Sequence, residues 1–382
     1  FVITVAYIFP TLFCSLLPCI QSCKETIFCK WNTRLVQLGL VRTMRVITCA
    51  SFYGTGSSAV TDYFSEYDDI CSLGNYEYRF LHEPDGIADL HYNVIENNNR
   101  HNTSDSIKRY IKYTDKLVKM GYGGYDIFDG NFEKYTKEFI EDITELKVHT
   151  WWNKDRTDRG RLFVLIDRIY SKLKCIFTGN LGTEIRFSLL TKLEYGYYTA
   201  ISEEEFLGAV KRYVQKLLSY VNKNNKPFVM VDQMVPPTGL NRYVKYFDDV
   251  KIIVVDRDPR DVYILEKEFW KWGVIPVDDV RDYVKWFLIT RKYATNVQED
   301  KDKVLRIKFE DMIYDYENTT EKLREFAGIS KEKHVRVRQI FNPDISIKNT
   351  NLKEQVKKYE EDIRYIEEHL KEYLYDFDAI RG

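Results

Sequence analysis

The chain has 382 residues, of which 44% are apolar and 30% are charged, and its formal net charge is −1. This balance is typical of a folded globular protein and excludes a disordered, collagen-like or low-complexity chain. A near-neutral chain has no overall basic field, so nucleic acid is not expected as its main partner.

The first 43 residues differ in composition from the rest. Residues 1–20 are almost all apolar and uncharged, and they are long enough to span a bilayer, although Pro10 and Pro18 interrupt the helical pattern. The first Met is Met44, directly before a strand pattern. Residues 1–43 are therefore either upstream sequence or an apolar leader with a membrane anchor at 1–20. Membrane contact is expected only in the second case.

Four of the seven cysteines lie in the leader, and the remaining three are Cys49, Cys71 and Cys175. Few, widely separated cysteines match neither a disulfide framework nor a zinc site, and the six histidines show no ligand spacing. We therefore expect reduced thiols, no metal and a cytoplasmic location. A membrane-anchored protein is the alternative if residues 1–20 form an anchor.

From Met44 onward, predicted strands alternate with predicted helices. Apolar and β-branched runs predict strands at 45–50, 71–78, 227–232, 250–256 and 304–308. Helical spacing and end signals predict helices at 106–120, 206–221, 280–293, 318–327 and 354–373. Ser202 and Glu205 form a capping box, and Gly328 ends a helix. The pattern indicates an α/β fold, a single domain with a central, mainly parallel sheet flanked by helices.

Residues 85–195 interrupt this alternation. The segment is polar, rich in Asn, Lys and Tyr, and shows no period-two pattern in its first half. It is predicted as a helical insertion within one domain that spans 44–382.

The first candidate binding motif follows the first predicted strand and opens a helix. Gly54 and Gly56 allow tight turns and a close approach of the backbone to a ligand. Thr55, Ser57 and Ser58 add hydroxyl donors near the positive end of the helix, which favours a phosphate-like anion. The loop lacks the GK[ST] of a Walker A motif. An ordinary strand-to-helix turn remains the alternative.

The second motif, VVDRDPRDVY at 254–263, runs from an apolar strand into a charged turn and a helix. Such turns lie at the carboxyl edge of a parallel sheet, where ligands bind. Arg257 has the geometry to bind a phosphate, and Asp258 or Asp261 to cap the helix. A salt-bridged turn is the other interpretation.

With these motifs in this order, the chain resembles the sulfotransferases that use 3′-phosphoadenosine 5′-phosphosulfate (PAPS), in particular bacterial-type members with a P-loop-like fold. VVDRDPRDVY is similar to the family's R-[ND]-P-[RK]-D motif, and VLRIKFED at 304–311 to its strand ending in E-D. EKLREFAG at 321–328 and SIKNT at 346–350 resemble later family segments. The resemblance covers most of 44–377.

The resemblance implies roles for individual residues. Gly54, Thr55, Gly56, Ser57 and Ser58 would hold the 5′-phosphosulfate, Arg257 the 3′-phosphate, and Lys348 is a candidate for a second contact to that phosphate. Two positions depart from the family pattern. Gly54 replaces a Lys or Arg that contacts the leaving group, and Leu265 replaces a Ser that binds the 3′-phosphate.

Sulfuryl transfer also needs a base for the acceptor hydroxyl. Relatives acting on glycans and tyrosine use a Glu after the second strand, a place held here by Glu77, and Arg79 would keep it ionised or contact substrate. A surface salt bridge between the two is the alternative. His82 and Glu83 are further candidates.

The acceptor site is expected in the insertion, where aromatic and basic residues suit a carbohydrate: Trp151, Trp152, Arg156, Arg159 and Arg161. A position of Trp151 and Trp152 in the core is the alternative. The predicted function is therefore sulfuryl transfer from PAPS to a hydroxyl, with a glycan as the expected partner. The alternatives are a P-loop kinase-like phosphotransferase and a catalytically weak nucleotide-binding homologue.

Overall fold

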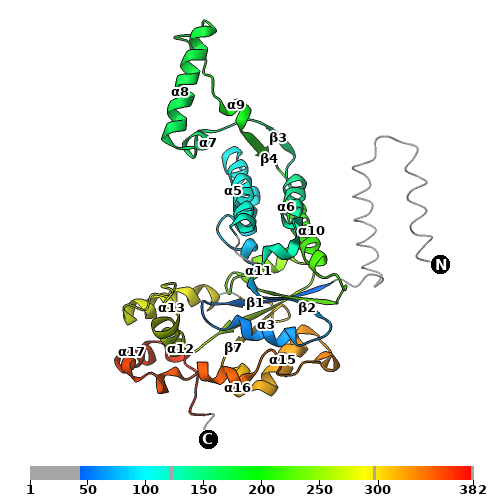
Figure 1. Cartoon of the computed structure of the whole chain (residues 1–382), viewed down its shortest axis with the longest axis vertical. Coiled ribbons are helices and arrows are strands. Elements are labelled where there is room, and N and C mark those ends of the chain that lie inside the picture. Colours follow the sequence, from blue (N-terminus) through cyan, green and yellow to red (C-terminus); the bar gives the residue numbers. More distant parts are fainter. Residues whose placement is uncertain (1–43, 121–123, 296–297, 380–382) are drawn as a thin grey trace, which may run out of the picture. The chain divides into compact units, whose positions relative to one another are not determined.

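Five parallel strands form the central sheet in the order β2-β5-β1-β6-β7 (Figure 1). The computed structural model describes residues 44–120, 124–295 and 298–379, and the predicted leader, 1–43, lies outside them. The strands are β1 (Arg45–Ser51), β2 (Ile70–Glu77), β5 (Phe228–Asp232), β6 (Val250–Asp256) and β7 (Val304–Lys308). All five predicted strands are present, and β6 and β7 have the predicted bounds.

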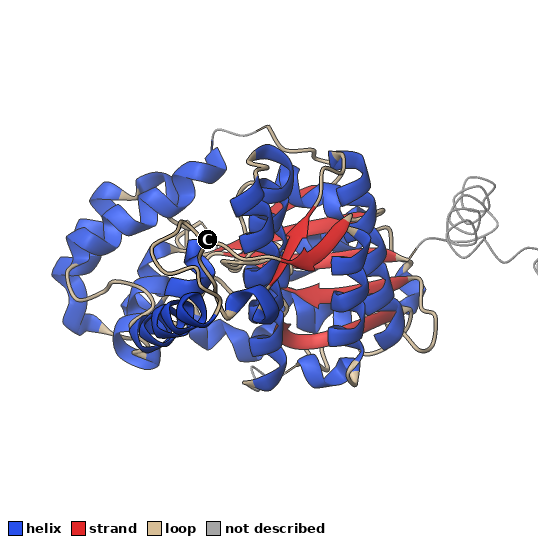
Figure 2. Ribbon diagram, turned by 90° about the horizontal axis from the view of Figure 1, so that it is seen from above, coloured by secondary structure: helices blue, strands red, loops and turns tan. Residues whose placement is uncertain are grey.

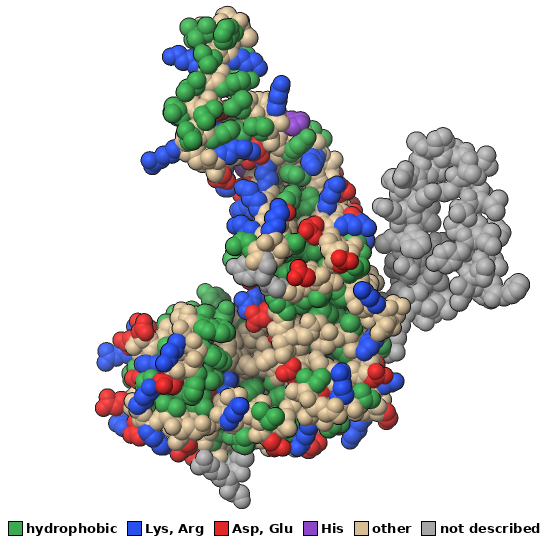
Figure 3. All heavy atoms as spheres, viewed as in Figure 1, with side chains coloured by type: hydrophobic (Ala, Val, Ile, Leu, Met, Phe, Trp, Pro, Cys, Tyr) green, Lys and Arg blue, Asp and Glu red, His purple; other side chains and the backbone are tan. Residues whose placement is uncertain are grey.

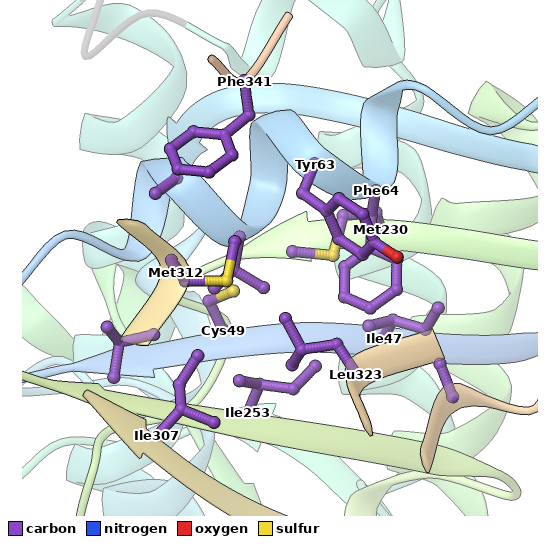
Figure 4. Packing of buried hydrophobic residues seen from close by; sticks show 14 of the residues in the cluster. Ile47, Cys49, Tyr63, Phe64, Met230, Ile253, Ile307, Met312, Leu323 and Phe341 are labelled. Carbon is purple, nitrogen blue, oxygen red and sulfur yellow. The ribbon is translucent and has the colours of Figure 1, made fainter. Parts of the chain in front are cut away.

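The sheet is buried on both faces, as the continuous apolar runs of β5 and β6 predict. On one face Ile47, Met230 and Ile253 pack in a cluster with residues of the helices that follow β1 and β7 (Figure 4). Cys49 belongs to this cluster and is fully buried, as expected for a small core residue. Packing in this core therefore holds β1, β5 and β6 in place, together with the loops that follow them.

Helices cover both faces of the sheet (Figure 2). They are α3 (Ser57–Ser65), α4 (Ile87–His91), α5 (Arg100–Lys119), α6 (Asn131–Asp142), α7 (Asn153–Thr157), α8 (Gly160–Phe177), α9 (Leu190–Leu193), α10 (Glu203–Val221), α11 (Leu240–Tyr243), α12 (Pro259–Ile264), α13 (Val280–Thr295), α14 (Asp311–Tyr314), α15 (Tyr316–Ala327), α16 (Pro343–Ser346) and α17 (Glu360–His369). Among the described residues, no helix combines the length and the apolar character needed to cross a membrane.

Local sequence explains several helix ends. Ser202 and Glu205 form the predicted capping box at the start of α10. Gly328, with a φ of 72°, ends α15 in the left-handed conformation. Asp258 accepts the N–H of Arg260 and caps α12.

The segment between β2 and β5 is mainly helical, but it also contains a two-stranded sheet that the sequence analysis did not predict. Strands β3 (Leu146–His149) and β4 (Tyr195–Tyr198) pair antiparallel, with Leu146 opposite Tyr198. Each strand has only four residues and β3 is fully exposed, so the apolar alternation of a half-buried strand is missing. Helices α7, α8 and α9 lie between them in the sequence.

The predicted terminal helix at 354–373 is wrong in its length. The structure has a ten-residue helix, α17, with short 3-10 turns before it at Leu352–Glu354 and Lys357–Tyr359 and after it at Lys371–Tyr373. Asn351 has a φ of 51°, and buried Asp261 accepts the N–H groups of Asn351 and Leu352. These hydrogen bonds hold the residues just before the predicted helix, and the helix itself is interrupted at Val356, whose backbone is not helical (φ −124°, ψ 89°).

Candidate active site

A cavity of about 820 Å³ lies at the carboxyl edge of the central sheet. Parallel α/β sheets bind ligands at this edge, because the loops after the strands and the N-termini of the next helices converge there. The ends of β1, β2, β5 and β6 contribute to its wall. The acidic and basic residues that line it are Asp62, Glu77, Arg79, His82, Asp232, Arg257, Glu266 and Arg291.

The loop between β1 and α3 forms one wall of the cavity through two glycines. Gly54 and Gly56 have φ angles of 72° and 93°, which L side chains rarely adopt. A Cβ atom on Gly54 would lie 2.5 Å from the ring of Trp270, and one on Gly56 would lie 2.5 Å from the ring of Phe309. Glycine is therefore required at both positions by backbone conformation and by space.

Helix α3 starts at this loop and leaves its first turn open to a ligand. No side chain caps the turn, and it contains no acidic residue. Ser57 and Ser58 both line the cavity, and the Ser57 hydroxyl lies 3.3 Å from Asp232 Oδ2 and accepts from Gln233 Nε2 at 3.2 Å. Uncapped N–H groups and the positive helix end favour an anion here.

Thr55 has a different role from its neighbours. It is fully buried, and its hydroxyl is bonded to the carbonyl oxygens of Phe52 at 2.6 Å and Val255 at 2.7 Å. Its N–H also donates to the Phe52 carbonyl. Thr55 therefore ties the loop to β6, and its side chain does not line the cavity as the sequence analysis expected.

Arg257 follows β6 and is only 4% exposed, yet it lines the cavity. Its guanidinium lies 4.5 Å from the Phe309 ring centre, donates to the Gly54 carbonyl at 3.4 Å and donates to the Asn349 carbonyl. Its Nε is buried and has no hydrogen-bond partner. Burial lowers the pKa of Arg257, but a guanidinium stays charged near neutral pH. An unused donor on a buried cation is suited to an anionic ligand.

Buried carboxyl groups surround Arg257. Burial raises the pKa of Glu310 to about 8 and that of Asp261 to about 6, and the charge of Arg257 opposes both shifts. Glu310 accepts the N–H of Asp258 at 2.9 Å, and Asp261 accepts those of Asn351 and Leu352. These carboxyl groups hold the turn after β6 and the 349–352 segment in place around the arginine.

Glu77 and Asp232 are paired residues at the ends of β2 and β5. Glu77 is exposed toward the cavity and forms an ion pair with Arg79, whose guanidinium also lies 5.5 Å from the ring centre of Tyr53. Asp232 is 2% exposed, and its Oδ1 has no partner. Burial, and then the charge of Glu77, raise the pKa of Asp232 to about 7. The cavity thus holds an accessible carboxylate beside a second carboxyl group that changes charge near neutral pH.

Comparison with protein families identifies the segment that contains β5, β6, α12 and β7. Residues 198–333 match the description "Sulfotransferase family". The matched segment comprises 136 of the 382 residues, and over this segment the chain is similar to that family. A comparison with curated proteins found no match.

The solved structures to which the chain is similar include three sulfotransferases. The sulfotransferase domain from the curacin biosynthetic pathway is 12% identical, with 78% of each chain covered and a TM-score of 0.39. The domain from the olefin synthase of Synechococcus PCC 7002 is 10% identical, covering 81% of this chain and 87% of that one, with a TM-score of 0.37. The sulfotransferase STF1 from Mycobacterium tuberculosis is 9% identical, with coverage of 84% and 80% and a TM-score of 0.34.

The cavity brings together most of the residues singled out from the sequence. The two glycines, Ser57, Ser58, Arg257, Glu77 and Arg79 all line it. Lys348 does not line it and is exposed, whereas Ser346 and Asn349 of the same segment do. Leu265, where relatives place Ser, lines the wall as an apolar residue that is 5% exposed.

The insertion does not contribute to this cavity among the described residues. None of the lining residues falls within 85–195. Trp151 and Trp152 instead line a separate hollow of about 140 Å³ with Arg100 and His101, and His101 stacks on Trp152 at 3.9 Å. The expectation that these tryptophans build the wall of the acceptor site is therefore wrong for this cavity.

Four charged residues that line the cavity were not singled out from the sequence: Asp62, Asp232, Glu266 and Arg291. Asp232 ends an apolar strand run, as Asp256 does at the end of β6, and this shared position was a usable signal. Arg291 lies within α13 and is 2% exposed. It pairs with Asp256 at 2.8 Å and lies 4.0 Å from the ring centre of Phe52. Nothing in the helical pattern marks Arg291, because its burial arises from packing against the β1 loop.

Proposed function

We propose that this protein transfers a sulfuryl group from PAPS to a hydroxyl group, and that the cavity at the sheet edge is where transfer occurs. The observation that carries the proposal is Arg257, a buried cation with an unused Nε donor in the wall of a cavity that also contains an uncapped helix start. PAPS carries negative groups at both ends of its ribose. Two separate anion sites in one cavity match that ligand.

The assignment of each end follows from the chemistry of the two sites. Arg257 would take the 3′-phosphate, because a guanidinium donates through several N–H groups to one phosphate. The turn through Gly54 and Gly56 and the start of α3 would take the 5′-phosphosulfate through backbone N–H groups and the Ser57 and Ser58 hydroxyls.

Arg79 is our candidate for the charge that relatives place at the position of Gly54. Its guanidinium lies over the ring of Tyr53, the residue directly before Gly54, and lines the same cavity. As the sulfur–oxygen bond to the departing phosphate breaks, the electron pair stays on the phosphate oxygen. A fixed cation stabilises the charge that develops there.

Glu77 is the candidate base. As the acceptor oxygen forms its bond to sulfur, the proton of that hydroxyl passes to the Glu77 carboxylate. Arg79 holds this carboxylate in place. Asp232 lies opposite Glu77 on β5 and carries no charge while it is protonated, so no second negative charge then lies beside the base.

We infer a carbohydrate acceptor from the mouth of the cavity. Trp270, Trp272 and Trp286 line it together with Tyr293, and Trp272 and Tyr293 are 74% and 71% exposed. Exposed aromatic faces beside charged groups offer both apolar contact and hydrogen bonding to a polar ring. A cytoplasmic location is also our proposal, and it agrees with the free thiols of Cys49, Cys71 and Cys175.

The proposal is tested in two steps on the full chain. Thermal melting with 3′-phosphoadenosine 5′-phosphate (PAP), ATP and GTP should show stabilisation by PAP alone. Transfer of ³⁵S from labelled PAPS should then label a glycan in a panel that also contains a tyrosine peptide and a small phenol. Stabilisation by ATP instead of PAP would contradict the donor, PAP binding without any labelled product would identify a non-catalytic homologue, and labelling of the peptide or phenol alone would contradict the carbohydrate acceptor.

A further inference from the structure

Helix α8 is held through one face only. Its buried residues are Asp167 and Cys175. Asp167 accepts hydrogen bonds from the Ser188 hydroxyl at 2.9 Å and the Leu189 N–H at 2.8 Å, and Cys175 donates to the Ile185 carbonyl. The helix is thus fastened to the connector that follows it.

The opposite face of α8 is apolar and exposed. Seven of its large apolar residues are 46–85% exposed: Leu162, Leu165, Ile166, Ile169, Leu173, Ile176 and Phe177. At 100° per residue they fall within an arc of about 120°. Leu181 and Ile185 of the connector are also exposed. In Figure 3 hydrophobic side chains cover much of this helix at the top of the view. A contiguous apolar stripe of this size marks an interaction surface.

Basic residues border this apolar face. On the same helical projection Arg161, Arg168 and Lys172 lie along one edge, and Lys174 lies along the other. Arg161, Arg168 and Lys172 form no ion pair with any described residue, and the one acidic residue of α8, Asp167, is buried. The accessible charge of α8 is therefore entirely positive.

We propose that α8 lies on an anionic membrane surface, with its apolar face among the lipid chains and its basic edges at the headgroups. An apolar stripe flanked by Lys and Arg is the arrangement that such interfacial helices share, because long basic side chains reach the headgroups while their stems remain apolar. A second copy of the chain is the less favoured occupant, because docking two α8 faces would bring their positive edges together.

The test is co-sedimentation of the full chain with vesicles of phosphatidylcholine alone or with 30% phosphatidylglycerol. The wild-type chain should pellet with the anionic vesicles and stay in the supernatant with the neutral ones. The triple variant Leu162→Ser/Ile166→Ser/Ile169→Ser should lose at least about tenfold in apparent affinity, because three apolar side chains no longer leave water on binding. Residues 1–43 are present in both proteins, so a difference between the two arises from α8.

A charge variant separates the two parts of the interaction. Arg161→Gln/Arg168→Gln/Lys172→Gln should lower the apparent affinity for anionic vesicles by at least about tenfold, because basic residues near such a surface are attracted to it. The matched control Lys322→Gln/Lys331→Gln/Lys371→Gln removes three exposed charges elsewhere and should bind as the wild type does. Melting temperatures of all variants should equal that of the wild type, because none of these side chains is buried.

Equal pelleting of the wild type and the serine variant would overturn the proposal, as would equal pelleting of the charge variant and its control. Sedimentation velocity gives a further outcome that would contradict it. If the wild type is a dimer that the serine variant converts to a monomer, and neither pellets with vesicles, the face binds a second copy. None of these outcomes depends on nucleotide binding or on sulfuryl transfer.

Discussion

The cavity at the sheet edge and helix α8 place their charged and apolar groups in opposite ways. Around Arg257 the ionisable groups are buried, and even Glu310 is 0% exposed. On α8 the apolar groups are exposed, and Phe177 reaches 85%. Burying charge is costly unless each group has a fixed partner, so the cavity is suited to one ligand geometry. An exposed apolar face makes contacts that need no fixed partner, so it is suited to a deformable surface such as a lipid layer. Substitutions should therefore have large effects in the first region and small ones in the second.

The largest expected effect is on the chemical step. Glu77→Gln should lower the rate of sulfuryl transfer by about 10²–10⁴ while leaving PAP affinity near that of the wild type, because the amide cannot accept the proton. The measurement is single-turnover transfer of ³⁵S at saturating PAPS. Glu83→Gln is the matched control, since Glu83 lies 3.9 Å from Arg79 but does not line the cavity. Equal losses in both variants would exclude Glu77 as the base.

Arg257→Ala should weaken PAP binding by about 100-fold or more, because charged hydrogen bonds contribute roughly 1.5–3 kcal/mol each. Isothermal titration with PAP measures the change. The substitution also leaves Asp261 and Glu310 buried without their cation, so Arg257→Lys is the second variant. Lysine keeps the positive charge but cannot donate two parallel hydrogen bonds to one phosphate. The PAP affinity of Arg257→Lys should therefore fall between those of the wild type and Arg257→Ala. Wild-type affinity in both variants would place the 3′-phosphate elsewhere.

Gly56→Ala should lower the free energy of unfolding by about 2–4 kcal/mol, since the left-handed backbone and the contact with Phe309 both oppose a side chain. Chemical denaturation measures the loss. Gly130→Ala is the control, with a φ of 75° and no atom within 4 Å of the added Cβ. Gly130→Ala should lower the free energy of unfolding by only about 1–2 kcal/mol, the effect of the left-handed backbone alone. Equal losses would show that Phe309 does not confine the loop.

Asp232→Asn should change the pH dependence of stability. The folded protein keeps a proton on Asp232 up to about pH 7, whereas the unfolded chain releases it near the ordinary pKa of 3.8. The free energy of unfolding of the wild type should therefore fall as pH rises between these values, by at most about 1.4 kcal/mol per pH unit. The asparagine variant should lack this part of the slope. Urea unfolding at several pH values provides the comparison, and parallel curves would contradict it.

The smallest effect is expected on α8. Ile169→Ser should change the free energy of unfolding by less than about 0.5 kcal/mol, because Ile169 is 50% exposed and contacts solvent on the apolar face. The same substitution in the sheet, Ile253→Ser, should cost about 3 kcal/mol or more, because Ile253 is fully buried. A large loss at Ile169 would mean that α8 is part of the folded core, and the contrast between the two regions would fail.

The sheet could be predicted from the sequence because its strands are buried on both faces and therefore read as continuous apolar runs. Residues 250–256 and 304–308 were predicted with the bounds that the structure has. The pairing of β3 with β4 could not be predicted, because each strand has only four residues, β3 is fully exposed and the buried residue of β4 is Gly196, so no alternating apolar pattern marks them. Local sequence also favoured one long terminal helix, which the non-helical backbone of Val356 interrupts.

The same division applies to the site. Gly54, Gly56 and Arg257 were identified because glycine spacing and a charged turn after a strand have local signatures. Thr55 was expected to face the ligand and Arg291 was not singled out, because the contacts of both side chains depend on tertiary packing. The acceptor residues were sought in the insertion, where aromatic residues are dense, but density in the sequence does not bring them to the sheet edge.

The bond from Thr55 to the Val255 carbonyl has a consequence for selectivity. It joins the loop after β1 to the strand that carries Arg257, and Arg257 itself donates to the Gly54 carbonyl. These hydrogen bonds join the two anion sites that we propose. Under that proposal, the joined sites favour nucleotides that carry two separate anionic groups, as PAPS does, over nucleotides whose phosphates form a single chain.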